Sequence, residues 1–196
     1  MRLIERTVSD LLAAFRSPDP TPGGGSAAAL AGAIGASLLA MVAGLPTSRA
    51  TTAADVERLK AAGDRCAASS GELEALVDRD TEAYDVVVAA YRKPKTTDDE
   101  KAARSVGIQA AMREAIAAPL AVMRACAAAA EQGVVIATLG HLSASSDVQV
   151  GFELLGAGLR GARLNVETNL GSVRDVEYVA RIRGEVEEVE RGVRRT

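Results

Sequence analysis

The sequence predicts an all-α fold, a helical bundle with long antiparallel helices. Helical periodicity appears along almost the whole chain, whereas the alternating β-branched runs that indicate strands are nearly absent. Only 3% of the residues are aromatic and there is no Trp, although 48% are hydrophobic and Ala and Gly are abundant. The core must therefore be built from small side chains, which favours closely packed helices. A chain of 196 residues has the length of one ordinary domain, so a single domain over residues 1–196 is expected.

The first expected helix covers residues 4–16, and the second runs through the uncharged residues 26–45. Between them Pro18, Pro20 and Pro22 exclude a helix. About 20 uncharged residues would also be long enough to span a membrane. Ala, Gly and Ser dominate this segment, however, and no aromatic belt flanks it. It is therefore interpreted as a central buried helix, and no membrane association is expected.

Residues 53–92 predict one very long helix, or two in near continuity. Along it, inward-facing positions alternate at spacings of three and four, a 3.5-residue repeat that packs in coiled-coil fashion. Lys93-Pro94-Lys95 ends the helix. With the small-residue helix before it, this uninterrupted seam predicts a homodimer. The seam consists of Val56, Leu59, Gly63, Cys66, Ser70, Leu73, Val77, Asp80, Tyr84, Val87 and Tyr91.

A capping box at residues 97–100 starts the next helix, which is expected to run to about residue 131, with breaks at Gly133 and Gly140 near its end. Ser146 and Asp147 have the pattern of an N-cap and first turn, and their helix continues to approximately residue 170. Residues 172–175 then cap a final charged helix.

Charge and cysteine content exclude several functional classes. The 23 basic and 26 acidic residues are mixed throughout and give a net charge of −3, so the basic stripe that nucleic acid binding requires is absent. Cys66 and Cys126 lie in helical patterns without a CxxC motif, which indicates buried reduced thiols. No basic-then-apolar leader follows Met1. A cytoplasmic protein is expected.

The run Gly23-Gly24-Gly25-Ser26 opens the uncharged helix and is the first candidate site. Consecutive glycines leave backbone N–H groups accessible to a ligand, and the helix dipole adds partial positive charge there. This arrangement suits an anionic or carbonyl-bearing ligand. The alternatives are a flexible connection and a tight helix entry. A P-loop is excluded, because the Gly-Lys-Ser/Thr sequence is missing.

Asp80 is the second candidate, because it occupies a seam position where the repeat requires an apolar residue. A carboxylate there must be paired, hydrated or functional. The alternatives to a functional role are a buried ion pair with an arginine of another helix and a seam that turns to solvent at this point.

The third candidate surface lies on the helix after Ser146. Asp147 and Asn165 are eighteen residues apart, which is five helical turns, so they point the same way. Small residues between them would let a backbone or a flat ligand approach. The alternative is a packing groove whose amides bond neighbouring loops. The surface comprises Asp147, Gly151, Gly158, Ala162, Asn165 and Asn169.

The single histidine and a pair of lysines are weaker indications of a functional site. His141 is the only histidine, so neither a His-rich metal site nor a Ser-His-Asp triad can form within one chain, and no metal is expected. Lys93 and Lys95 would attract a polycarboxylate such as a glutamate tail, or are simply solvated at a helix end.

Taken together, these motifs resemble the cyclodeaminase domain of formiminotransferase-cyclodeaminase and the related stand-alone methenyltetrahydrofolate cyclohydrolases. The resemblance covers nearly the whole chain. Two departures from the family pattern bear on the exact reaction: Lys93 stands where Leu often precedes Pro-Lys, and His141 where a Gly-Asn pair is usual. The matching segments are residues 21–28 and 41–42, then 80–84, 94–95 and 100–101, then 146–147, 161–162, 165–166, 169–170 and 175.

The resemblance implies an all-helical homodimer that binds a tetrahydrofolate derivative, without metal and without a cofactor beyond that substrate. Asp80 stands at the position of the family's catalytic aspartate, as a general base or as a nucleophile. The residues expected to bind substrate are Gly23, Gly24, Gly25, Ser26, Tyr84, Lys95, Asp147, Asn165 and Asn169.

Two reactions fit this resemblance. A cyclodeaminase converts 5-formimino-tetrahydrofolate to 5,10-methenyl-tetrahydrofolate plus ammonia, and a cyclohydrolase hydrolyses 5,10-methenyl-tetrahydrofolate to 10-formyl-tetrahydrofolate. No formiminotransferase segment occurs in these 196 residues, so a cyclohydrolase and a cyclodeaminase served by a separate transferase are equally expected. The alternative is a non-catalytic helical folate-binding or scaffold protein. The presence of Asp80 with the glycine run and both asparagines argues against it.

Overall fold

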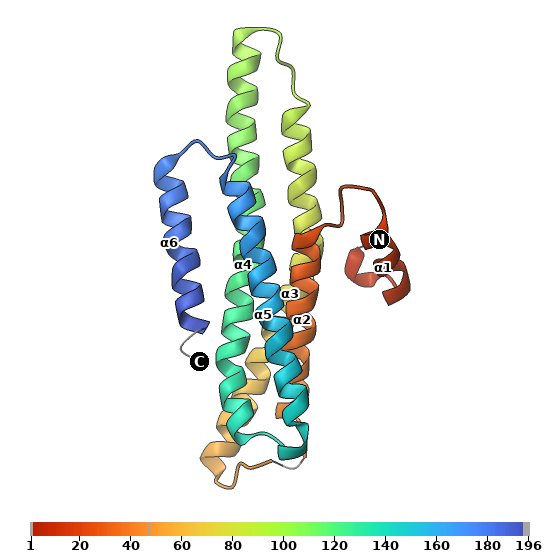
Figure 1. Ribbon diagram of the computed structural model, residues 1–196, viewed down its shortest axis with the longest axis vertical. Helices are drawn as coiled ribbons and strands as arrows, with labels where there is room; N and C mark the ends of the chain where they lie inside the picture. The colour runs from red at the N-terminus through yellow and green to blue at the C-terminus, as the bar shows by residue number, and fades with distance from the viewer. Residues whose placement is uncertain (1, 47, 194–196) are drawn as a thin grey trace.

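A computed structural model describes residues 2–46 and 48–193, and it shows an antiparallel helical bundle (Figure 1). Helices α2 to α5 run side by side along the long axis, α6 lies against α4, and α1 is set to the opposite side of the bundle. The described residues contain no strand, so the predicted all-α class is confirmed. The elements are η1 (Leu3–Glu5), α1 (Val8–Arg16), α2 (Gly24–Ala43), α3 (Ala53–Tyr91), α4 (Asp98–Leu139), η2 (Leu142–Ala144), α5 (Ser145–Leu170) and α6 (Val176–Val193).

Helix α2 packs between α3 and α5, as expected for a central helix. Its contacts rely on residues without side chains. A Cβ at Gly35 would stand 2.7 Å from the Gly151 carbonyl oxygen, and one at Gly158 would stand 2.8 Å from that of Ala28. Helices α2 and α4 are long and apolar enough to cross a membrane by length and composition, yet half of each apolar window is buried inside the bundle.

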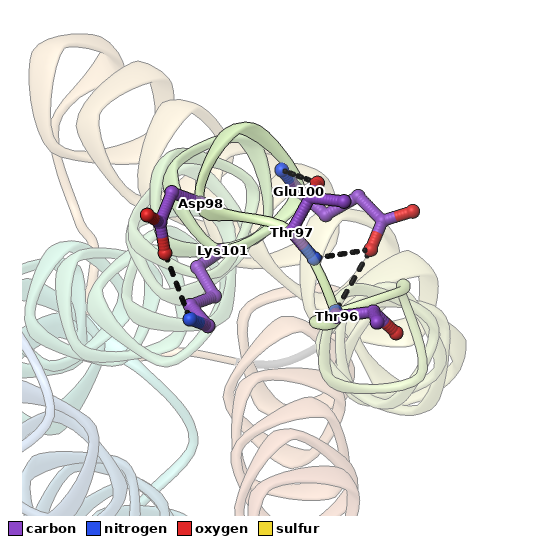
Figure 2. A network of polar contacts seen from close by, with 5 residues as sticks. All are labelled: Thr96, Thr97, Asp98, Glu100 and Lys101. Carbon is purple, nitrogen blue, oxygen red and sulfur yellow. Dashed lines mark hydrogen bonds and ion pairs between the residues drawn. The ribbon is translucent and has the colours of Figure 1, made fainter.

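The capping box predicted at the start of α4 is confirmed (Figure 2). The Thr97 hydroxyl accepts the Glu100 N–H at 3.2 Å. In return the Glu100 carboxylate accepts the N–H groups of Thr96 at 2.8 Å and of Thr97 at 3.0 Å. Lys101 pairs with Asp98 one turn along, at 2.8 Å. These four contacts fix the first turn of the longest helix.

Several helix boundaries differ from the sequence prediction. Ser146 is not the N-cap of α5, because that helix begins at Ser145 with Ala144 as its N-cap residue. The first expected helix is divided: residues 3–5 form a separate 3₁₀ turn, because the backbone N–H groups of Leu3 and Ile4 bond to Asp78 and Thr7 caps α1 afresh. Helix α4 does not stop near residue 131 but continues to Leu139. Gly133 does not break it, because it lies buried in α4, where a Cβ would meet Phe152 at 2.8 Å.

The seam of α3 is buried only along part of its length. From Leu59 to Val77 its members are buried against α2 and α4, whereas Tyr84 and Tyr91 are exposed. The reason is visible in Figure 1, where α3 and α4 extend well past the start of α2 and the end of α5. Beyond Asp80 the seam still contacts α4, through Val87, but α2 and α5 no longer cover it, and a cavity lies there.

Candidate active site

A cavity of about 420 Å³ lies where α2 begins and α5 ends, against the passing helices α3 and α4. All three candidate surfaces of the sequence contribute to it: the glycine run, Asp80, and the α5 face through Asn165 and Asn169. Its walls are Pro20, Thr21, Gly23, Gly24, Asp80, Ala83, Tyr84, Val87, Tyr91, Met112, Ala115, Asn165, Asn169 and Ser172.

Asp80 is bound to the first turn of α2. Its Oδ2 accepts the Ser26 backbone N–H at 3.0 Å and the Ser26 hydroxyl at 3.3 Å. The N-cap residue of α2 is Gly23, which has no side chain to satisfy these first-turn N–H groups. The carboxylate of α3 therefore performs the capping role for α2, and the helix dipole favours its negative charge.

Gly25 is required by this arrangement. A Cβ at position 25 would stand 2.0 Å from Asp80 Oδ1 and 2.4 Å from its carboxyl carbon, far inside any tolerable contact. At Gly24 a Cβ would only touch Asn165 Nδ2, at 3.7 Å. The glycine run is thus a tight helix entry whose function is to admit the carboxylate of Asp80.

The alternative of a buried ion pair is not found, because the hydrogen-bond partner of the half-buried Asp80 carboxyl is Ser26 and not an arginine. The other alternative holds in part, since the seam turns towards solvent beyond Asp80, where Tyr84 and Tyr91 are exposed. Burial raises the pKa of Asp80, and the two hydrogen bonds from Ser26 only partly oppose this. The folded protein therefore binds this proton more tightly than the unfolded chain does. The stability contributed by Asp80 is largest at low pH and falls as the pH rises through the raised pKa. A carboxyl whose pKa is raised in this way accepts a proton more readily than an ordinary aspartate does, and it can return that proton to a leaving group.

Asn165 and Asn169 are held by main-chain carbonyls. Asn165 Nδ2 donates to the Gly161 carbonyl oxygen at 2.9 Å, and Asn169 Nδ2 donates to that of Ala115 at 2.8 Å. A carbonyl can only accept, so the NH₂ group of each carboxamide must face it. In each case this leaves Oδ1 as the side-chain atom that can accept a hydrogen bond from a ligand. The predicted alternative had these amides bonded to neighbouring loops. They bond instead to carbonyls within α5 and α4, and both side chains also line the cavity.

The remaining predicted site residues do not all meet at this cavity. Tyr84 lines it. Gly25 and Ser26 do not line it but contact Asp80: Gly25 leaves room for its carboxylate, and Ser26 donates hydrogen bonds to it. Lys95 lies in the exposed connection between α3 and α4, outside the lining. Asp147 begins α5, about 27 Å along the helix axis from Asn165. Substrate binding stays a prediction for all of these residues.

The sequence reasoning did not single out several lining residues. Val87 and Tyr91 belong to the seam and carried a signal, since each follows Asp80 on the same face. Met112 and Ala115 carried none, because α4 is apolar around much of its circumference. Ser172 was treated only as part of a cap.

A second cavity adjoins the first through Pro20 and Tyr84 and is bordered by Arg92 and Lys93. His141 is remote from both, at the junction of α4 and η2, where its ring nitrogen accepts the Ser143 N–H at 3.1 Å. Within residues 2–46 and 48–193 no three His, Cys, Asp or Glu side chains cluster in a way that would hold a metal ion.

The chain was compared with known proteins. A sequence model of the family described as formiminotransferase-cyclodeaminase matches residues 7–188. The chain belongs to this family. The resemblance inferred from the sequence motifs is confirmed.

Two relatives of the chain carry different enzyme names. Methenyltetrahydrofolate cyclohydrolase of Methylorubrum extorquens is 38% identical over 169 residues, covering 86% of this chain and 81% of that protein. Formimidoyltransferase-cyclodeaminase of Sus scrofa is 32% identical over 185 residues, covering 92% of this chain and 34% of that protein. The chain therefore spans about a third of the length of the pig protein.

The fold also matches a solved structure. Formiminotetrahydrofolate cyclodeaminase from Thermotoga maritima superposes with a TM-score of 0.81 at 24% identity, covering 97% of this chain and 91% of that one. The predicted formiminotransferase-cyclodeaminase-like helical bundle is thereby confirmed.

Proposed function

We propose that this chain catalyses a one-carbon reaction on a tetrahydrofolate derivative, either as a formiminotetrahydrofolate cyclodeaminase or as a methenyltetrahydrofolate cyclohydrolase. The observation that carries the proposal is the Asp80 carboxyl, fixed by Ser26 at the wall of a cavity of about 420 Å³. That volume lies in the range of sites for small molecules and cofactors. Relatives with both names support the two candidate reactions.

The cavity suits a cationic one-carbon unit. Asp80, Asn165 and Asn169 all have oxygen acceptors, and one N–H of each asparagine NH₂ group is already donated to a backbone carbonyl. A formimino or methenyl group bridging or flanking N5 and N10 carries delocalised positive charge. Oxygen acceptors placed around such charge stabilise it as it develops or moves.

Asp80 is assigned the proton transfers. In cyclodeamination N10 attacks the formimino carbon, Asp80 accepts the N10 proton, and the tetrahedral carbon expels ammonia, which leaves with a proton returned by Asp80. In cyclohydrolysis water attacks the methenyl carbon and gives a proton to Asp80. The bond from that carbon to N5 then breaks: Asp80 returns its proton to N5, the hydroxyl on the carbon releases its proton to solvent as the formyl C=O forms, and 10-formyl-tetrahydrofolate remains.

The near-ultraviolet absorbance of methenyl-tetrahydrofolate tests the proposal and separates its two forms. Appearance of the absorbance from 5-formimino-tetrahydrofolate is expected of a cyclodeaminase, and accelerated loss of it from methenyl-tetrahydrofolate is expected of a cyclohydrolase. If the folded protein binds folate but changes neither signal, it is the non-catalytic binding or scaffold protein instead.

We also propose that the chain forms a homodimer. Helices α2 and α5 pack together and leave large apolar residues exposed, among them Ile34 at 46% and Leu164 at 69%. Light scattering is expected to give twice the chain mass, and Ile34→Glu is expected to shift the protein towards monomer. A wild-type monomer at micromolar concentration would contradict the proposal. Because Asp147 lies about 27 Å from Asn165, it can serve a folate site only across such an interface.

The remaining assignments follow from this function. The protein is proposed to act in the cytoplasm, away from membranes, with no metal or cofactor beyond the folate substrate. Lys95, together with Arg92 and Lys93 at the adjoining cavity, is proposed to attract the carboxylates of the substrate's glutamate moiety.

A further inference from the structure

Pro119 interrupts the backbone hydrogen bonding of α4 beside the candidate site. The helix runs from Asp98 to Leu139 with this proline inside it. Proline has no N–H, so the carbonyl of Ala115, four residues earlier, has no donor within the helix. Ala115 lines the cavity that contains Asp80. The gap in the helical ladder therefore lies at the cavity wall.

Asn169 of α5 supplies the missing donor. Its Nδ2 atom lies 2.8 Å from the Ala115 carbonyl oxygen, in a partly buried setting. An unpaired buried carbonyl costs free energy, so this hydrogen bond stabilises the protein by satisfying the Ala115 carbonyl of α4. The carboxamide is planar, so fixing its NH₂ group also fixes the position of Oδ1.

We propose that Pro119 is a positioning residue for Asn169. By leaving the Ala115 carbonyl without a helical donor, it holds Asn169 Oδ1 as an acceptor for the substrate. The inference rests on the proposed folate function, which it deepens. With alanine at position 119, an N–H returns to the helix and satisfies Ala115, so the Asn169 carboxamide loses its fixed orientation.

Asn165 provides an internal comparison. Its Nδ2 bonds to the Gly161 carbonyl oxygen at 2.9 Å, which lies one turn earlier in the same helix. That carbonyl lies within the regular hydrogen-bonding pattern of α5, which contains no proline. The orientation of Asn165 is therefore independent of position 119.

Calorimetric titration of 5-formyl-tetrahydrofolate into Pro119→Ala tests the proposal. The Kd is expected to rise about three- to tenfold, the value of one net hydrogen bond, while the midpoint of thermal unfolding stays equal or increases because a helix-breaking residue is removed. A merely structural proline would not weaken binding while the fold gains stability. An unchanged Kd in Pro119→Ala overturns the proposal.

Two controls refine this test. In an Asn169→Ala background, Pro119→Ala is expected to have no further effect on Kd, and a second, additive loss would overturn the claim that Pro119 acts through Asn169. Pro46→Ala, an exposed proline just beyond the C-terminal end of α2, is expected to bind as the wild type does.

Amide exchange by NMR separates this inference from the proposed function. The Asn169 side-chain NH₂ is expected to exchange slowly in the wild type and faster in Pro119→Ala, while that of Asn165 does not change. Equal exchange in both proteins overturns the pairing of Pro119 with Asn169. If the wild type binds no folate, the proposed function fails, and the NMR comparison still decides the pairing.

Discussion

Asp80→Asn is expected to lower kcat by about a hundred- to ten-thousandfold, the usual contribution of a general acid–base group. Asparagine has the same shape and keeps an oxygen that can accept the Ser26 N–H, so the cap of α2 is retained. It cannot take up a proton from N10 or from water. Rates come from the methenyl-tetrahydrofolate absorbance assay, and thermal unfolding is expected to show an intact fold.

Glu82→Gln is the matched control for this substitution. Glu82 lies on α3 two residues from Asp80, but its side chain is 66% exposed and pairs with Arg79 at 3.8 Å. The same loss of one carboxylate charge is therefore expected to leave kcat unchanged. Full turnover by folded Asp80→Asn would show that the assignment of Asp80 is wrong.

The pH dependence of kcat/KM adds a second signature to the same experiment. The basic form of Asp80 is the active one, so kcat/KM is expected to rise with pH through the pKa of this group. Burial raises that pKa, which places the acidic limb above the ordinary range of aspartate. Glu82→Gln is expected to keep this limb, and Asp80→Asn to lose it from its residual activity.

Much of the site could be predicted from the sequence because three of its parts leave local signals. Asp80 breaks an apolar seam, the glycine run opens a helix without an N-cap side chain, and Asn165 and Asn169 share one helical face. Periodicity establishes which side of a helix a residue occupies, and the cavity lining agrees with it at these positions.

Periodicity does not establish height along the bundle, and here the prediction was weakest. The five-turn separation of Asp147 and Asn165 follows from their spacing, but the spacing does not tell that the cavity lies at the Asn165 end of α5. Glycine was equally ambiguous: Gly133 was expected to break α4 but instead gives room to Phe152. Pro119 marks the Ala115 carbonyl as one without a helical donor, but local reasoning cannot tell that Asn169 of another helix supplies the donor.

Gly25→Ala is expected to lower kcat/KM by about a hundredfold or more, although it adds only one methyl group and removes no functional atom. The new Cβ would stand 2.0 Å from Asp80 Oδ1 and 2.7 Å from Oδ2. Either the carboxylate rotates away and gives up both hydrogen bonds from Ser26, or α2 moves away from α3. Both responses displace the proton-transferring group from the cavity, and both lower the thermal unfolding midpoint.

Gly71→Ala and a double variant identify the cause of this effect. Gly71 also lies in a helix, but a Cβ there meets nothing within 4 Å, so its replacement is expected to keep full activity and to add up to about 1 kcal/mol of stability. In Gly25→Ala/Asp80→Gly the clash is absent, so the unfolding midpoint is expected to recover relative to Gly25→Ala while activity does not. Wild-type activity in Gly25→Ala would mean that the carboxylate of Asp80 can act without its bond to Ser26. The close approach of the glycine run to Asp80 would then be a packing feature alone.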